Sequence, residues 1–163
     1  ALSAELLVLG GVFPGPGEAR DAAERALDEG AAAERFAAMA TELGGPSDLL
    51  ENVDAHLPAA AVVRAAEPTE AGTVVAVDVR AVGMAVVGLG GGRARETDPV
   101  DHSVGFTEVA ALGERVGPGE RPLAVVHARD DASAAQAAGA LRAAFSLGDG
   151  PEQSLPIVME VLR

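Results

Sequence analysis

The sequence predicts an α+β protein in which a helical segment, residues 1–58, is followed by a mixed α/β domain, residues 59–163. Two observations support this fold class. Apolar residues recur at helical spacing before Pro58, whereas the segments after it are rich in valine and alternate as strands do. The change in character near Pro58 is the one candidate domain boundary, and no internal repeat is evident.

The helical segment divides at its glycines and prolines. Residues 2–9 read as the end of an amphipathic helix, stopped by Gly10 and Gly11 and followed by the turn residues 14–17. Alanines at helical spacing predict a second helix that closes at Gly30. Phe36, Met39 and Leu43 predict a third, which ends at residues 44–46, and a short helical turn is expected over residues 47–53.

The second part of the chain predicts strands interleaved with two helices. The first helix covers residues 80–89, and the second is capped by Asp131 and extends its inner face to Phe145. The predicted strands are residues 60–65, 73–79, 123–128 and 156–162. A polar, glycine-bearing stretch separates the first helix from the strand at residues 123–128.

Composition excludes several classes of function. The net charge is −13, and all 12 basic residues are arginine. An acidic chain is a poor partner for nucleic acid or anionic lipid, which bind clustered positive charge. The absence of lysine excludes Schiff-base, P-loop and lysine-borne carrier chemistry within this chain. The absence of cysteine excludes disulfides and thiolate catalysis, and it fits a cytoplasmic protein.

The ends of the sequence suggest a piece of a longer protein. No apolar run reaches the roughly 20 residues of a membrane helix, and no signal peptide is recognisable. The chain begins Ala1-Leu2-Ser3 without methionine, inside a helical pattern that has no cap. We therefore expect the chain to be a fragment.

The stretch GLGGGRARETD, residues 88–98, resembles a phosphate-binding loop only superficially. A P-loop requires Lys-Ser or Lys-Thr after its glycines, where this chain has Arg93-Ala94. A dinucleotide fingerprint requires a strand before its glycines, and here a helix precedes them. We expect Gly90 to close that helix in a left-handed conformation, with Gly91 and Gly92 as a flexible exit. The alternative is a mobile loop near a ligand.

The histidines and acid pairs give weaker indications. His56, His102 and His127 have no metal-site spacing among them. His127 is expected to be a packed or edge residue of its strand, while His102 has acids and Ser103 beside it. A hydrolase that uses His102 with Asp98 or Asp101 is therefore an alternative function. The remaining acid pairs, Asp130-Asp131 and Glu96 with Asp98, are expected to be solvated.

Residues 113–126, GERVGPGERPLAVV, are similar to a half-repeat of lipoyl and biotinyl carrier folds, in which turn glycines alternate with inward valine and leucine. Those carriers present a modified lysine, which this chain lacks. The similarity leaves a second alternative, a free-standing, non-catalytic binding module with a lipoyl-like half-barrel.

Three blocks together resemble the C-terminal part of the pyrimidine-nucleoside phosphorylase family, to which thymidine phosphorylases belong. They are AAERFAAMATELGGPSDLLEN at 32–52, RAVGMAVVGLGGGR at 80–93 and DPVDHSVGF at 98–106, and GERV with RPLAVVHA continues the match to residue 128. The resemblance covers nearly the whole chain in order. It departs from the family pattern at His102, where the family often has tyrosine.

The resemblance implies a parent enzyme that cleaves thymidine or deoxyuridine with phosphate, giving the free base and 2-deoxyribose 1-phosphate. It implies that residues 1–58 are the tail of the family's α/β phosphate-binding domain. It also implies that residues 59–163 form an α/β-hammerhead domain with a barrel-sandwich-like core. The intact enzyme is expected to be a homodimer without a cofactor, and the missing N-terminal part is the expected partner of this chain.

The family's Lys-His-Ser-Thr-Gly-Gly phosphate motif does not occur in this sequence, and nothing matches its base-holding Arg, Ser and Lys. We therefore assign no catalytic, cofactor or metal residue and expect this chain alone to be inactive. The resemblance and the glycine content favour one candidate, a loop over residues 90–99 that reaches toward the catalytic cleft, with Gly90, Gly91, Gly92 and Arg93 at its start.

Overall fold

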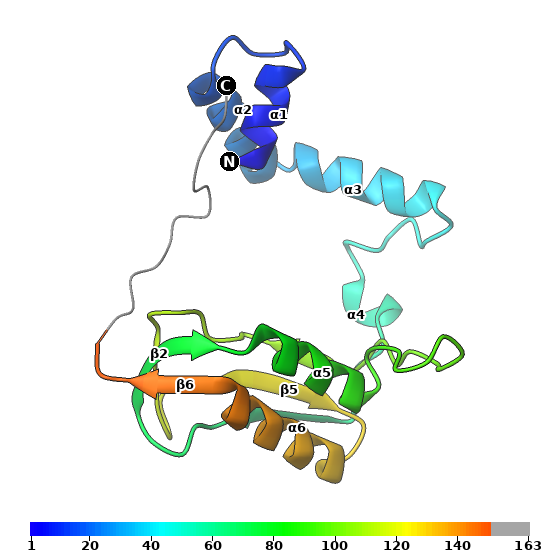
Figure 1. Ribbon diagram of the computed structural model, residues 1–163. Helices are drawn as coiled ribbons and strands as arrows, with labels where there is room; N and C mark the ends of the chain where they lie inside the picture. The colour runs from blue at the N-terminus through cyan, green and yellow to red at the C-terminus, as the bar shows by residue number, and fades with distance from the viewer. Residues whose placement is uncertain (151–163) are drawn as a thin grey trace. The chain divides into compact units, whose positions relative to one another are not determined.

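A computed structural model describes residues 1–150 of the chain (Figure 1). Within these residues the chain forms two compact units, residues 1–56 and 57–150. The first is helical and the second combines helices with two antiparallel sheets, so the predicted α+β class is confirmed. The strand expected over residues 156–162 lies outside the described residues.

The first unit contains four helices: α1 (Leu2–Leu9), α2 (Pro16–Asp28), α3 (Ala31–Glu42) and α4 (Val53–His56). The turn chemistry that predicts these helices is present. Pro16 occupies the first turn of α2, and Gly30 takes a left-handed φ of 87° between α2 and α3. One prediction is wrong: α1 is not amphipathic but apolar on nearly all sides. It packs on α2, and Ala4 and Ala19 are the buried residues of these helices.

The second unit holds two three-stranded sheets. In the first, β5 (Ala124–Ala128) lies between β1 (Val62–Ala66) and β3 (Gly105–Thr107). In the second, β2 (Gly72–Val77) lies between β4 (Arg115–Val116) and β6 (Phe145–Gly148). All four pairings are antiparallel, and among the described strands neither sheet closes into a barrel.

Two helices complete this unit and continue strands of the second sheet. Strand β2 leads through Asp78 into α5 (Val79–Leu89), and α6 (Asp131–Ala144) leads directly into β6. Figure 1 shows β2 and β6 side by side, and α5 packs on α6. The Asp78 amide donates to the Ala144 carbonyl at 2.8 Å, where the two strand–helix segments meet. This bond fixes the junction of sheet and helices.

The core lies between α6, α5 and the two sheets and is built from small and branched residues. Leu89, Leu123 and Leu141 are its largest fully buried side chains. Alanine on the inner face of α6 lets the helix approach β1 and β5 closely. The other fully buried large side chains are Val74, Val116 and Val126.

Three details differ from the prediction. The N-cap of α6 is Asp130, not Asp131, because the Asp130 carboxylate accepts the Ser133 amide at 2.7 Å. Phe145 is the first residue of β6 and does not belong to α6. Because Phe145 follows Leu141 by four residues, the two side chains would share a face in a helix and also in a strand. A bulge in β2 between Val74 and Ala76 interrupts the predicted alternation of faces.

The segment similar to a lipoyl half-repeat crosses from one sheet to the other. Val116, Leu123 and Val126 point inward as the similarity predicts. However, β4 and β5 belong to different sheets. In the turn between them, the Gly117 amide donates to the Arg121 carbonyl and the Glu120 amide donates to the Gly117 carbonyl, each at 3.0 Å. The segment is therefore not a single carrier hairpin.

Candidate functional site

The end of α5 is closed by glycine, as predicted. Gly90 has a φ of 99°, and its amide donates to the Val87 carbonyl at 3.0 Å. The Gly91 amide donates to the Val86 carbonyl, also at 3.0 Å. These two bonds make a Schellman motif, which satisfies the last free carbonyls of the helix. The glycine at position 90 thus has a structural reason that requires no ligand.

Gly91 and Gly92 are packed closely, so they have a structural reason other than the flexible exit predicted from the sequence. A Cβ at Gly91 would lie 3.0 Å from Val86 Cγ1 and 3.1 Å from the Val104 carbonyl oxygen. A Cβ at Gly92 would lie 2.9 Å from Val87 Cγ2. These glycines allow the chain to turn back against the last turn of α5.

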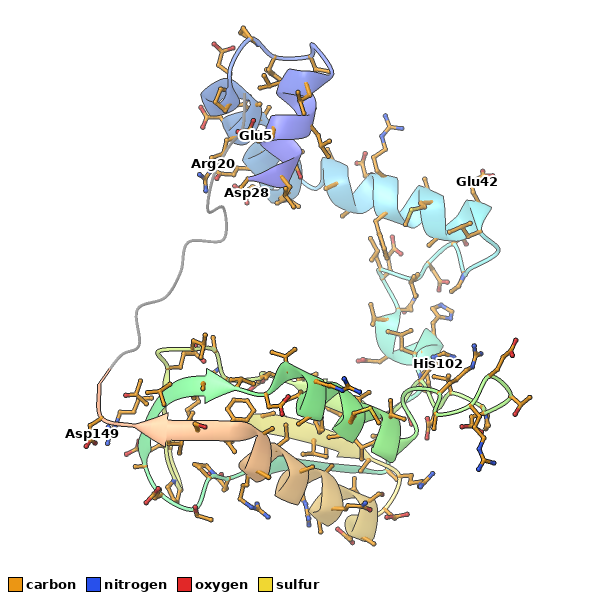
Figure 2. All side chains as sticks on the ribbon, in the orientation of Figure 1. Glu5, Arg20, Asp28, Glu42, His102 and Asp149 are labelled. Carbon is orange, nitrogen blue, oxygen red and sulfur yellow. The ribbon has the colours of Figure 1, made fainter. Side chains whose placement is uncertain are left out.

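We call residues 90–101 the glycine loop; Figure 2 shows it beyond the end of α5. The Asp101 amide donates to the Gly90 carbonyl at 2.9 Å and closes its base. Further along, Arg93 Nε donates to the Asp98 carbonyl at 3.1 Å, and the Arg95 amide donates to the Asp98 carboxylate at 2.8 Å. The loop therefore holds a defined turn, and Arg93 lies exposed on it.

A group of polar residues supports the base of the glycine loop. The Ser103 hydroxyl and amide both donate to Asp101 Oδ1, at 2.6 and 2.9 Å. These bonds, with the nearby charges of Arg129 and His102, lower the pKa of Asp101. Arg129 comes from the end of β5, and a Cβ at Gly90 would lie 3.7 Å from its Nη1. Its cation therefore lies at the C-terminal end of α5, where positive charge is favourable.

Sequence reasoning did not identify Arg129 as part of this region. It is distant in sequence from the loop, and only the folding of the chain brings it close to Gly90 at the end of α5. A lone arginine after a strand carries no local signal that could have revealed it.

The three histidines are not brought together. His102 is exposed in the glycine-loop region (Figure 2). His127 lies in the central strand β5, not at an edge, and its Nε2 is 2.9 Å from Thr107 Oγ1. His56 Nε2 is 2.8 Å from Asp48 Oδ1, and Asn52 also donates to that carboxylate. These hydrogen bonds, led by that of Asn52, lower the pKa of Asp48.

The geometry gives little support to hydrolase chemistry at His102. A serine nucleophile needs a base that accepts its proton, usually a histidine. The Ser103 hydroxyl instead donates to Asp101, which lies two residues earlier in the same turn.

The sequence predicts that the pair Asp130-Asp131 is solvated. Asp130 caps α6, and the hydrogen bonds from Ser133 lower the pKa of its carboxyl group. The Asp131 side chain is exposed.

A groove of 270 Å³ lies between α5 and α6. Its walls are mostly apolar and include Met84, Gly88 and Ala137, with Ser133 and Gln136 as polar members. Among the described residues that line it, none carries a charged side chain, so this groove is not suited to hold phosphate. Among residues 1–150, no cluster of three or more His, Cys, Asp or Glu could hold a metal ion, and no helix is long and apolar enough to cross a membrane.

The comparison with known proteins identifies the family. Residues 73–148 match the model of the pyrimidine nucleoside phosphorylase C-terminal domain, and the chain belongs to this family. The matched segment runs from β2 to the end of β6 and includes the glycine loop and its support.

The curated relatives specify the resemblance further. Thymidine phosphorylase of Burkholderia cenocepacia is 53% identical over 152 residues, which are 93% of this chain and 34% of that protein. Thymidine phosphorylase of Burkholderia orbicola gives the same values, and that of Burkholderia lata is 48% identical over 161 residues, 99% of this chain and 36% of the relative. The chain thus spans about a third of the length of the curated relatives it matches.

Proposed function

We propose that this chain is the C-terminal part of a thymidine phosphorylase, which supports an active site located in the preceding part of the polypeptide. The observation that carries the proposal is the 53% identity over 93% of the chain to a protein about three times as long. The proposed reaction is phosphorolysis of thymidine, in which a phosphate oxygen bonds to C1′ as the bond from C1′ to the base breaks. The products are thymine and 2-deoxyribose 1-phosphate.

The chain's own residues support the location of the chemistry elsewhere. Phosphate binding in a protein of this acidity requires a concentrated positive pocket. The sequence has no lysine and lacks the Lys-His-Ser-Thr-Gly-Gly motif that the family uses. The intact enzyme is proposed to supply both from its preceding part and to associate as a homodimer.

The glycine loop is the proposed contribution of this chain to the cleft. Its base is fixed by the Gly90–Asp101 hydrogen bond, and its turn is fixed by Asp98. Arg93 uses Nε for the bond to Asp98, which leaves its two terminal nitrogens as donors for an anion. We propose that Arg93 meets phosphate or the nucleoside when the cleft closes.

The test of this role uses the intact protein and two variants in the same loop. Arg93→Ala is expected to lower kcat/KM by about tenfold, roughly the loss of one charge-assisted hydrogen bond. Arg95→Ala is the matched control, because the Arg95 main-chain amide, not its guanidinium, binds Asp98. Its kinetics are expected to change less than about twofold. Unchanged kinetics of Arg93→Ala with both phosphate and nucleoside would exclude the role of Arg93.

The overall function is tested by the stoichiometry of the reaction. The intact protein is expected to release thymine from thymidine only when phosphate is present, with one 2-deoxyribose 1-phosphate formed for each thymine. Thymine release without phosphate would indicate a hydrolase. This is the alternative function suggested by His102 and the neighbouring Ser103.

A further inference from the structure

Helix α1 is apolar on the side that faces α2 and also on the opposite side. Successive residues of a helix are rotated by about 100°, which places Leu2, Leu6 and Leu9 within an arc of about 60°. Ala4, which is buried, lies roughly opposite this arc. The three leucines are 77%, 68% and 82% exposed. We call them the leucine face of α1.

The contact between α1 and α2 is too small to explain the composition of α1. Ala4 and Ala19 are the buried residues of the two helices, and alanine contributes little apolar area. An eight-residue helix is not stable in water by itself. A helix with leucines on its free side is typical of a position in the interior of a larger protein, where both sides are covered.

The length of the relatives indicates what covers the leucine face. Each thymidine phosphorylase relative extends well beyond the aligned third. Because the matched family domain is the C-terminal one, most of this additional length precedes it in sequence. Such a segment is covalently joined to α1 and meets it at a high effective concentration.

A second copy of the chain is a less favourable occupant. The first unit carries far more aspartate and glutamate than arginine. Two copies facing each other through α1 would bring two acidic surfaces together, which opposes association.

We propose that the leucine face of α1 is an internal packing surface of the intact enzyme, covered by the polypeptide that precedes this chain in sequence. The inference rests on the proposed function, in which this chain is the C-terminal part of a longer phosphorylase. It assigns to α1 the role of attaching the first unit to that preceding part.

Thiol labelling tests the inference, since the chain has no cysteine of its own. The variant Leu6→Cys places a thiol in the centre of the leucine face. Ala4→Cys is the buried control, and Glu24→Cys is the exposed control on α2, where the glutamate side chain is 60% exposed. The labelling rate with a maleimide is measured in the 163-residue chain and in the intact protein. Peptide mass spectrometry separates the introduced thiol from native ones.

The Leu6→Cys thiol is expected to react rapidly in the 163-residue chain and at least about tenfold more slowly in the intact protein, because access then requires local opening. Glu24→Cys is expected to react at similar rates in both, and Ala4→Cys slowly in the intact protein.

Equal rates for Leu6→Cys in the two proteins would overturn the inference. Protection that grows with the concentration of the 163-residue chain would also overturn it, because a second copy would then be the occupant. Rapid labelling of Ala4→Cys in the intact protein would contradict the packing of α1 on α2 and would overturn it as well. Thymine release by the same intact sample is measured separately. Protection without activity would therefore refute the proposed function and leave the packing surface in place.

Discussion

Replacing Gly91 by alanine is expected to destabilise the second unit, although its backbone conformation admits alanine. Gly91 is not among the residues with positive φ, so the cost comes from contacts alone. The new Cβ would lie 3.1 Å from the Val104 carbonyl oxygen, a backbone atom, and 3.0 Å from Val86 Cγ1. Relief requires the backbone after α5 to move away from Val104. Such overpacking costs about 1–3 kcal/mol.

Gly83 provides a matched control for this substitution. It lies inside α5, and a Cβ there would meet no atom of residues 1–150 within 4 Å. Gly83→Ala is expected to stabilise the protein by about 0.5–1 kcal/mol, because alanine loses less backbone entropy in a helix. Gly91→Ala and Gly83→Ala are thus expected to change the free energy of unfolding in opposite directions.

Urea unfolding followed by far-ultraviolet circular dichroism measures both variants, since the chain has no tryptophan or tyrosine for fluorescence. The midpoint is expected to fall for Gly91→Ala and to rise for Gly83→Ala, with unchanged slopes. A Gly91→Ala variant as stable as the parent protein would refute the close packing of the loop on α5. That result would favour the expectation from the sequence that Gly91 and Gly92 form a flexible exit from α5.

Three further results are expected from the structure. Asp78→Ala removes the carboxylate that accepts the Ala81 amide at 2.9 Å and should lower the unfolding free energy by about 0.5–2 kcal/mol, whereas Asp78→Asn should retain most of it; urea unfolding distinguishes them. Leu141→Ala opens a cavity beneath α6 and should cost about 2–5 kcal/mol in the same assay, while an effect under about 1 kcal/mol would contradict the core assignment. Stability should fall as the pH drops below about 4, because hydrogen bonds lower the pKa values of Asp101 and Asp130 in the folded state and this stabilisation is lost on protonation. Asp101→Asn and Asp130→Asn should each reduce that acid dependence, and profiles identical to the parent's would exclude the contribution of these carboxylates.

The elements with strong local signals are predictable from the sequence. Glycine and proline mark the ends of α1, α2 and α3, and the valine-rich segments become β1, β2 and β5. The left-handed closure of α5 at Gly90 is predicted because only glycine adopts that conformation readily.

The short strands are not predictable by the same reasoning. β3 and β4 have three and two residues, too few to show alternation, and they exist because β5 and β2 offer them hydrogen-bonding partners. β6 follows α6 without a break, and Phe145 at helical spacing disguises its start. Tertiary pairing, not local propensity, decides these segments.

The candidate site is predictable only in part. The glycine loop is recognisable by composition, but its support from Arg129 depends on a contact between distant segments. Gly91 and Gly92 illustrate the same limit, because a glycine needed for close approach and one needed for flexibility are identical in a sequence.

The most direct test of the proposed function compares the 163-residue chain with the intact protein in phosphate-dependent release of thymine from thymidine. We expect activity in the intact protein and none above background in this chain, even at high concentration. Phosphorolysis by the chain alone would contradict it and would place catalytic groups within these residues, with the glycine loop and Ser103 as the first region to mutate.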